Sequence, residues 1–159
     1  MVSIKAVTSE DWQLLKELRL KAIADSPGAF GDSVEMVSSK SDVYWKNGIA
    51  SSDVFVAEEN ETWIGMIVFK QDDDGVWSVK SLWVDPDYRN QGIGKLLIEE
   101  ALTSAKNKGI KLIELGVSVK SDSAIDLYTS LGFEIVRKID DEKMGDGSVG
   151  SLYTMRLSL

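Results

Sequence analysis

The spacing of hydrophobic residues along the chain switches between two periods, and this predicts a mixed fold of helices and strands. Segments in which apolar residues recur every three or four positions predict helices, and they lie at 11–24, 42–49, 93–108 and 121–131. Short runs rich in Val, Ile, Phe and Trp predict strands, and they lie at 3–7, 54–58, 63–70, 76–84, 111–119, 133–139 and 152–157. The order β-α-α-β-β-β-α-β-α-β-β indicates an α+β domain around one sheet.

The two helical segments after Gly92 and Ser121 have the most regular patterns. The first carries apolar residues at i, i+3, i+4, i+8 and i+12, which are Ile93, Leu96, Leu97, Ala101 and Ala105. The second places on one side Ala124, Leu127, Tyr128 and Leu131. Each stripe predicts a helix that buries one face against the sheet.

The composition limits the chemistry that the chain can perform. Its 159 residues suit one domain, so we expect a single domain over 1–159. There is no Cys and no His, which excludes thiolate nucleophiles and disulfides and removes the commonest general base and metal ligand. We therefore expect no metal, and proton transfer must use carboxylates, Tyr, Lys or ordered water.

Charge and hydropathy narrow the choice of partners. The net charge of −8 argues against a nucleic-acid partner, which needs clustered Lys and Arg, and favours a cationic small molecule. The longest apolar run, 64–69, is too short to span a bilayer. The first residues lack the pattern of a signal peptide, so we expect a cytoplasmic protein with no membrane partner.

The stretch VDPDYRNQGIGKLL, residues 84–97, leaves a strand, turns and opens a helix. Free N–H groups at a helix start bind anions, and Gly92 and Gly94 would let a phosphate approach the backbone. A dinucleotide fingerprint would need a glycine where Leu97 stands, and the spacing of a P-loop is missing. From these residues alone, a phosphate site and an ordinary glycine-containing turn both remain open.

Two motifs make the interpretation more specific. The segment 89–94, RNQGIG, matches an Arg/Gln-x-x-Gly-x-Gly/Ala motif, and 124–133, AIDLYTSLGF, matches Ala-x-x-Leu-Tyr-x-x-x-Gly-Phe. In both motifs and in element order the chain resembles the GNAT N-acetyltransferase superfamily, and 18–31 is similar to the first helix and loop of many members. The resemblance implies a mostly antiparallel twisted sheet of six to seven strands, splayed between two parallel strands, with four helices.

The resemblance also implies that the protein binds acetyl-CoA and acetylates a primary amine. Backbone groups of Leu82, Trp83 and Val84 would hold the pantetheine arm, and the Val84 N–H would stabilise the oxyanion. Tyr128 would protonate the leaving thiolate. Ser121 stands where members often have Asn, and would still contact the cofactor. The pyrophosphate would be held by the residues of the glycine turn, which are Arg89, Asn90, Gln91, Gly92, Ile93, Gly94 and Lys95.

The general base is the main departure from the family. Many members carry a glutamate on one of the two splayed strands, but the positions that align with it here hold Lys80 and Gly116. Glu114 points to the same face as Gly116 because it lies two residues away on one strand, so it is a candidate base. Asp32, Glu35 and an ordered water are the alternatives.

Two functions are consistent with the sequence. The first is an N-acetyltransferase in which the amine attacks acetyl-CoA directly, because no cysteine can carry the acetyl group. The second is a catalytically weak module that binds acyl-CoA, and Lys80 and Gly116 favour it. The acceptor stays open among small-molecule and peptide amines. Trp45, Trp77 and Trp83 are candidates to shape its pocket, and a homodimer is expected because members often form dimers.

Overall fold

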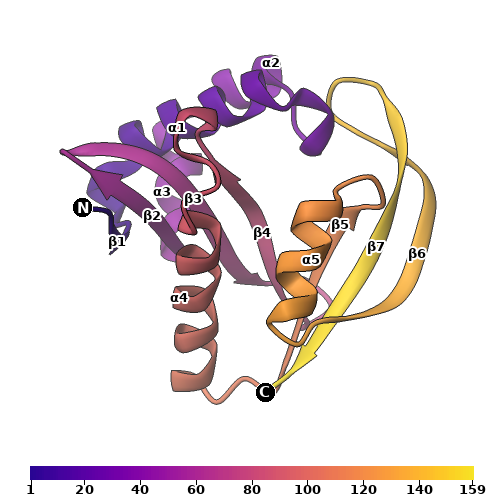
Figure 1. Cartoon of the computed structure of the whole chain (residues 1–159). Coiled ribbons are helices and arrows are strands. Elements are labelled where there is room, and N and C mark those ends of the chain that lie inside the picture. Colours follow the sequence, from indigo (N-terminus) through magenta and orange to yellow (C-terminus); the bar gives the residue numbers. More distant parts are fainter.

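The computed structural model describes all 159 residues and contains one seven-stranded sheet in the order β1-β2-β3-β4-β5-β7-β6. The strands are β1 Ser3–Ala6, β2 Asp53–Glu59, β3 Thr62–Gln71, β4 Trp77–Val84, β5 Leu112–Ser118, β6 Glu134–Lys143 and β7 Val149–Ser158. Only β4 and β5 pair in parallel, and every other neighbouring pair is antiparallel. The predicted α+β class with a mostly antiparallel sheet is confirmed (Figure 1).

Five helices accompany the sheet, where four were predicted. They are α1 Trp12–Asp25, α2 Val34–Ser38, α3 Asp42–Ala50, α4 Ile93–Asn107 and α5 Asp122–Ser130. The missed helix α2 has five residues, of which only Val37 is buried, so no helical period can be recognised in it. It depends on its cap, because Ser33 Oγ accepts a hydrogen bond from the Met36 N–H at 3.2 Å.

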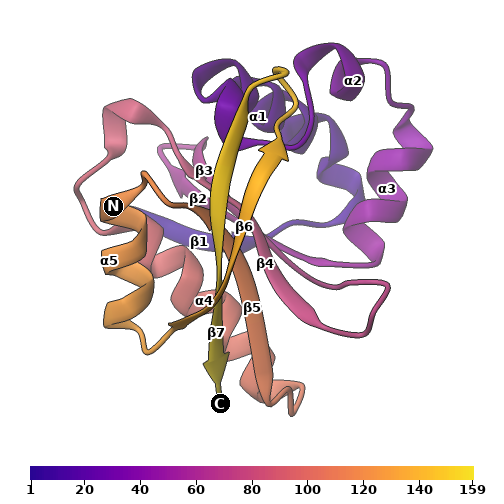
Figure 2. The same cartoon turned by 90° about the vertical axis from the view of Figure 1, so that its right-hand side faces the viewer.

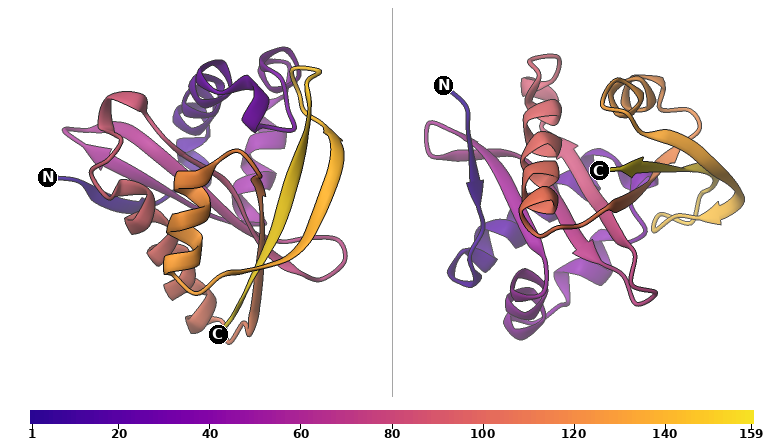
Figure 3. Two further views of the ribbon diagram at one scale, coloured as in Figure 1. Left: turned by 45° about the vertical axis from the view of Figure 1, so that its right-hand side comes forward. Right: turned by 90° about the horizontal axis from the view of Figure 1, so that it is seen from below.

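The helices cover the two faces of the sheet in separate groups (Figures 2 and 3). Helices α4 and α5 contribute to one apolar core, and α1, α2 and α3 contribute to the other. The predicted stripe on α4 is wrong at one position, because Leu96 is 43% exposed and Ile98 is fully buried in its place. None of the five helices has the length and hydrophobicity needed to cross a membrane.

Candidate active site

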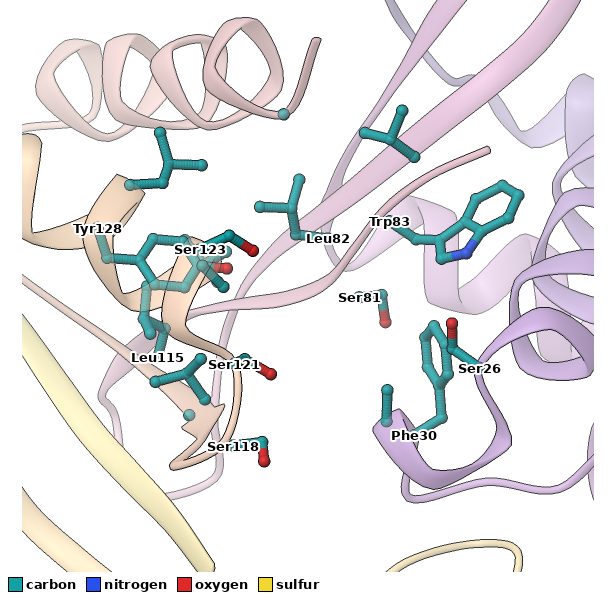
Figure 4. Close-up of a pocket in the computed structure, with 18 of the residues that line it drawn as sticks. Ser26, Phe30, Ser81, Leu82, Trp83, Leu115, Ser118, Ser121, Ser123 and Tyr128 are labelled. Carbon is teal, nitrogen blue, oxygen red and sulfur yellow. The ribbon is translucent and has the colours of Figure 1, made fainter. Parts of the chain in front are cut away.

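The two parallel strands pair over three residues and then separate. The last pair of the ladder is Val79 with Leu115, and beyond it a cleft of about 830 Å³ opens between the strands. Figure 4 shows one wall of the cleft with Leu115, Ser121 and Tyr128, and the opposite wall with Phe30 and Ser81. Because a strand edge without a partner leaves N–H and C=O groups free, β4 offers hydrogen-bonding backbone to this cleft.

A bulge in β4 contributes to the separation. Met66 and Val68 of β3 face Trp83 and Lys80, so both Ser81 and Leu82 lie opposite the single residue Ile67. Ser81 adopts a left-handed conformation with φ of +57°. An extra residue of this kind bends a strand and increases its twist. The bulge begins two residues after Val79, the last residue of β4 that pairs with β5.

The end of β4 directs one backbone group into the cleft. The Asp85 N–H donates to Ile64 O at 2.8 Å, across the ladder to β3. Because backbone groups of successive strand residues point to opposite edges, the N–H and C=O of Val84 point away from β3. The Val84 C=O accordingly accepts a hydrogen bond from Arg89 Nε at 2.9 Å.

Local sequence explains the turn from β4 into α4. Asp85 Oδ1 accepts from the Asp87 N–H at 3.0 Å, and Asp85 also forms an ion pair with Lys21. Burial raises the pKa of the Asp85 carboxyl, but the hydrogen bonds from Lys21 and the Asp87 N–H outweigh it and hold the pKa below its usual value. The Asp85 carboxylate therefore holds the turn on two sides, through the Asp87 N–H within the turn and through Lys21 on α1.

The first turn of α4 has the features of an anion site. Gly92 precedes the helix with φ of +78°, a conformation that favours glycine. It provides no side-chain cap, so the first N–H groups of α4 lack an internal partner. Asn90, Gly92, Ile93 and Gly94 line the cleft at this point. These N–H groups and the helix dipole favour a bound phosphate.

The guanidinium group of Arg89 is held by two partners in other segments of the chain. Its Nη2 donates to Asp25 Oδ2 at 2.8 Å, while its Nε is bound to the Val84 carbonyl. Asp25, at the end of α1, also accepts from Trp83 Nε1 at 3.0 Å and from Ser26 Oγ at 2.7 Å. The hydrogen bond from Trp83, followed by those from Ser26 and Arg89, holds the pKa of Asp25 below its usual value despite partial burial. Arg89 thus joins the end of β4 to α1.

Ten of the twelve predicted cofactor-binding residues line this one cleft. They are Leu82, Trp83, Val84, Arg89, Asn90, Gly92, Ile93, Gly94, Ser121 and Tyr128. Gln91 and Lys95 do not line it, and Lys95 forms a surface pair with Glu99 at 3.9 Å on the same helix. The sequence therefore predicted which segments meet, although not the direction of every side chain.

Tyr128 lies on α5 and reaches the cleft from the buried side of the helix. Only 7% of the residue is exposed, and its ring contacts Phe133 edge-on at 5.8 Å between centroids. Burial raises the pKa of Tyr128 to about 12. The hydroxyl therefore keeps its proton at neutral pH and can donate it.

The candidate bases have cationic partners or lie elsewhere. Glu114 Oε2 accepts from Arg156 Nε at 2.9 Å, and Oε1 lies 3.8 Å from Arg137 Nη2. Asp32 is paired with Arg19 at 3.0 Å. Glu35 lines neither of the two cavities described here. The carboxylates of Glu114 and Asp32 thus already neutralise arginines.

Lys80 and Gly116, expected from the sequence to stand where many family members carry a glutamate, line both cavities. Lys80 Nζ donates to Asp72 Oδ1 at 2.6 Å. Burial raises the pKa of Asp72, but the hydrogen bonds from Lys80 and Ser78 outweigh it and hold the pKa below its usual value. Gly116 has no side chain and open space around it. No group of three His, Cys, Asp or Glu side chains lies close enough together for a metal.

A second cavity of about 600 Å³ continues from the first on the far side of the bulge. The two cavities share several lining residues, including Phe30, Lys80, Ser81 and Met144. Arg19 and Glu114 line the second cavity and do not line the first. The sequence did not identify Arg19, Phe30 or Met144 as site residues. The similarity of 18–31 to other first helices and loops was the only signal for the first two, and Met144 belongs to no pattern.

Of the three tryptophans predicted to shape a pocket, Trp83 lines the first cavity. Trp45 and Trp77 line neither cavity. Trp45 is buried in the core formed with α1 to α3, and Trp77 packs on Phe69 at 5.0 Å between ring centroids. An aromatic residue on a strand or helix fills a core as readily as a pocket, so sequence could not separate these cases.

Comparisons with known proteins agree with this geometry. Residues 19–133 match the model of the Acetyltransferase (GNAT) family. The chain is 44% identical over 59 residues to the uncharacterized N-acetyltransferase MJ1207 of Methanocaldococcus jannaschii, covering 37% of the chain and 26% of that relative. It is 42% identical over 50 residues to the ribosomal protein bS18-alanine N-acetyltransferase of Escherichia coli, covering 31% of the chain and 34% of that relative.

A solved structure extends the similarity over the whole chain. The protein yncA from Salmonella typhimurium, solved with its cofactor acetyl-CoA, matches with a TM-score of 0.82 at 19% identity, over 100% of this chain and 94% of that one. At this identity the match concerns the fold. The chain spans about a third or less of the length of the two curated relatives, so their sequences are similar to it mainly in one segment.

Proposed function

Because the chain belongs to the acetyltransferase (GNAT) family, we propose that it transfers an acetyl group from acetyl-CoA to an amine. The observation that carries this proposal is the cleft where β4 and β5 separate, which ends at the uncapped start of α4. Acetyl-CoA supplies an acetyl thioester. Its extended arm needs an unpaired strand edge and its pyrophosphate needs an anion site, and the cleft offers both.

The residues of the cleft divide into two binding tasks. On β4, backbone groups of Leu82 and Val84 would hold the pantetheine arm, while Trp83, whose backbone groups face Met66 of β3, would border it. The N–H groups from Asn90 to Gly94 would hold the pyrophosphate. Arg89, bound to Asp25 and Val84, would keep these two parts of the site at a fixed distance. Ser121 borders the cleft from the residue before α5.

Two groups of the chain would stabilise the negative charge that develops during acetyl transfer. The Val84 N–H, directed away from β3, would donate to the carbonyl oxygen as negative charge grows on it. The Tyr128 hydroxyl, protonated at neutral pH, would give its proton to the departing sulfur. Since the chain has no cysteine, both substrates would be bound together and the amine would attack directly.

Proton removal from the amine does not require Glu114. Its carboxylate oxygens face Arg156 and Arg137 and are already engaged in ion pairs with them. Ordered water in the second cavity is the better-supported route. Glu114 borders the second cavity, but its ion pairs with Arg156 and Arg137 leave no uncompensated negative charge to attract an incoming ammonium group.

A second candidate function is an acyl-CoA-binding module without catalysis. The observation that favours it is the same pairing of acidic groups: Glu114 and Asp32 are bound to arginines, and Lys80 replaces the usual glutamate. Tyr128 disfavours it, because a module that only binds needs no proton donor in this position.

The release of free CoA thiol from acetyl-CoA separates the two candidates. The assay would use a panel of amines containing a polyamine, an aminoglycoside, lysine, amino acids and short peptides with free N-termini. We expect release that depends on one class of amine. Binding of acetyl-CoA with no release under any condition would favour the module instead.

The same assay tests the cofactor site with a glycine pair. A Cβ at Gly94 would stand at ordinary contact distance from Leu127 and Val84, 3.8 and 3.9 Å, so Gly94→Ala should fold normally. The motif admits alanine at this position, so acetyl-CoA binding should stay within about threefold of wild type, whereas Gly92→Ala, which places a Cβ on a residue with φ of +78°, should weaken it about tenfold by displacing the start of α4. Gly48→Ala on α3, where nothing lies within 4 Å, is the matched control and should bind as the wild type does.

A further inference from the structure

Arg19 reaches from α1 to the boundary between the two cavities. Its side chain is 17% exposed. One guanidinium nitrogen donates to Ser81 Oγ, and another donates to Asp32 Oδ2 at 3.0 Å. The guanidinium also lies over the ring of Phe30, 5.0 Å from its centroid. One side chain therefore joins α1, the loop before α2 and strand β4.

The contact with Ser81 falls on the strained residue of the bulge. Ser81 has φ of +57°, a left-handed conformation that strains a residue with a Cβ. The strand leaves β5 two residues earlier, after Val79. A hydrogen bond from Arg19 to the Ser81 side chain holds β4 where its direction changes.

The contact with Asp32 fixes the opposite side of the site. Asp32 follows Phe30, which lines both cavities. The backbone of this loop is also held by Gly145 of the β6–β7 turn, whose N–H donates to Phe30 O at 2.9 Å. A guanidinium presents several N–H groups in one plane and can bind two oxygens at once, which a lysine does less well.

We propose that Arg19 is a positioning residue for acetyl transfer. It holds the bulge of β4 and the Phe30 loop at a fixed separation, so that the end of the acetyl-CoA cleft faces the second cavity, where the amine binds. This inference rests on the proposed function. Arg19 itself stays charged and paired with Asp32, so it acts through Ser81 and the loop and takes no part in proton transfer.

The kinetic test uses Arg19→Leu. Thermal unfolding checks that this variant is folded, and Arg19→Lys is the milder variant to use if it is not. A small misplacement of reacting groups lowers the rate strongly, so we expect kcat to fall about 10- to 100-fold. The Kd for acetyl-CoA should stay within about threefold of wild type, equivalent to less than about 0.7 kcal/mol. A kcat within about twofold of wild type for both variants would overturn the proposal.

A rescue experiment distinguishes positioning from general loss of structure. Glycine adopts the left-handed conformation without cost, so Ser81→Gly should restore part of the kcat lost in Arg19→Leu. Ser81→Ala retains the strain and has no hydroxyl, so it should restore none. Equal kcat values for the two double variants would contradict the role of Arg19 at the bulge.

Hydrogen exchange tests the same contact without any reaction. Peptides that cover 79–85 should exchange faster in Arg19→Leu than in the wild type, in the absence of substrates. Lys46→Met, which removes one positive charge from an exposed pair on α3, should match the wild type. Unchanged exchange in Arg19→Leu would overturn the inference. A wild-type protein that releases no CoA with any amine would instead overturn the proposed function, while the exchange result still decides whether Arg19 holds β4.

Discussion

At the scale of single residues, burial and hydrogen bonding decide whether each polar group of the site is neutral or charged. Tyr128 lines the cleft, and Asp25 lies behind it, bonded to the lining residues Trp83 and Arg89; their environments shift the two pKa values in opposite directions. Burial raises the pKa of Tyr128 to about 12, so it keeps its proton. Hydrogen bonds from Trp83, Ser26 and Arg89 lower the pKa of Asp25, so it stays charged. Tyr128 therefore presents a neutral hydroxyl to the cleft, whereas Asp25 is a structural anion.

The role of Tyr128 can be tested by removing its hydroxyl group alone. Tyr128→Phe keeps the ring and its contact with Phe133 but removes the proton donor. We expect kcat to fall about 100-fold or more, because a general acid contributes about 10²–10⁴ in rate. The Kd for acetyl-CoA should change little. Tyr44→Phe, at an exposed tyrosine of α3, is the control, and equal kcat for Tyr128→Phe and wild type would refute the assignment.

The charge of Asp25 should appear in the pH dependence of stability. Its pKa is lower in the folded protein than in the unfolded chain, so its contribution is present above about pH 4 and is lost as pH falls through the folded pKa. We expect Asp25→Asn to reduce the free energy of unfolding at pH 7 by about 1–2 kcal/mol.

Denaturant unfolding between pH 2 and 7 gives the measurement. The difference between wild type and Asp25→Asn should shrink below about pH 4, as the wild-type carboxyl becomes protonated. Asp126→Asn, on the exposed side of α5, is the control and should follow the wild type. A difference that stays constant down to pH 2 would show that the charge of Asp25 is not the cause.

At the scale of elements, periodicity predicted the secondary structure well and the contacts between elements poorly. All seven strands and the four longer helices lie within a few residues of their predicted bounds, because the helices repeat apolar residues every three or four positions and the strands are short runs rich in β-branched and aromatic residues. The short helix α2 depends on one serine cap and was missed. The ion pair of Glu114 with Arg156 joins β5 to β7 across 42 residues, and local pattern contains no information about such a partner.

The error on α4 leads to a stability test. Leu96 and Leu97 are neighbours in sequence, but Leu96 is 43% exposed and Leu97 is fully buried. We expect Leu97→Ala to lower the free energy of unfolding by about 2–5 kcal/mol, because it leaves a cavity in the core. Leu96→Ala should change it by less than about 0.5 kcal/mol. Urea unfolding of both variants would contradict this assignment if their losses were equal.

At the scale of the whole molecule, the site depends on segments that are far apart in sequence. The first cavity is built mainly by the segment 79–128, which contains the first motif and the first half of the second, and this explains why its lining could be predicted. The second cavity combines α1, the loop before α2 and the β6–β7 turn. These contributions meet only after folding, and the motifs do not extend to them. The segments that form the first cavity could therefore be inferred from the sequence, and those that form the second could not.

The close contact between Gly145 and Asp32, beside the second cavity, allows a prediction at the scale of the whole molecule. A Cβ at Gly145 would overlap the backbone of Asp32, so Gly145→Ala must separate the β6–β7 turn from the loop that carries Phe30. Since Phe30 and Met144 line the second cavity, the change should raise the KM for the amine about tenfold, a loss of about 1.4 kcal/mol. The Kd for acetyl-CoA should be unaffected, because its proposed binding groups on β4 and α4 are not displaced.

Gly150→Ala is a matched control on the same hairpin, because nothing lies within 4 Å of its added Cβ and its backbone is not left-handed. It should leave both constants at their wild-type values. If Gly145→Ala instead weakened acetyl-CoA binding and left the KM for the amine unchanged, the turn would belong to the cofactor site. The assignment of the two cavities to the two substrates would then have to be reversed, since the same loop borders both.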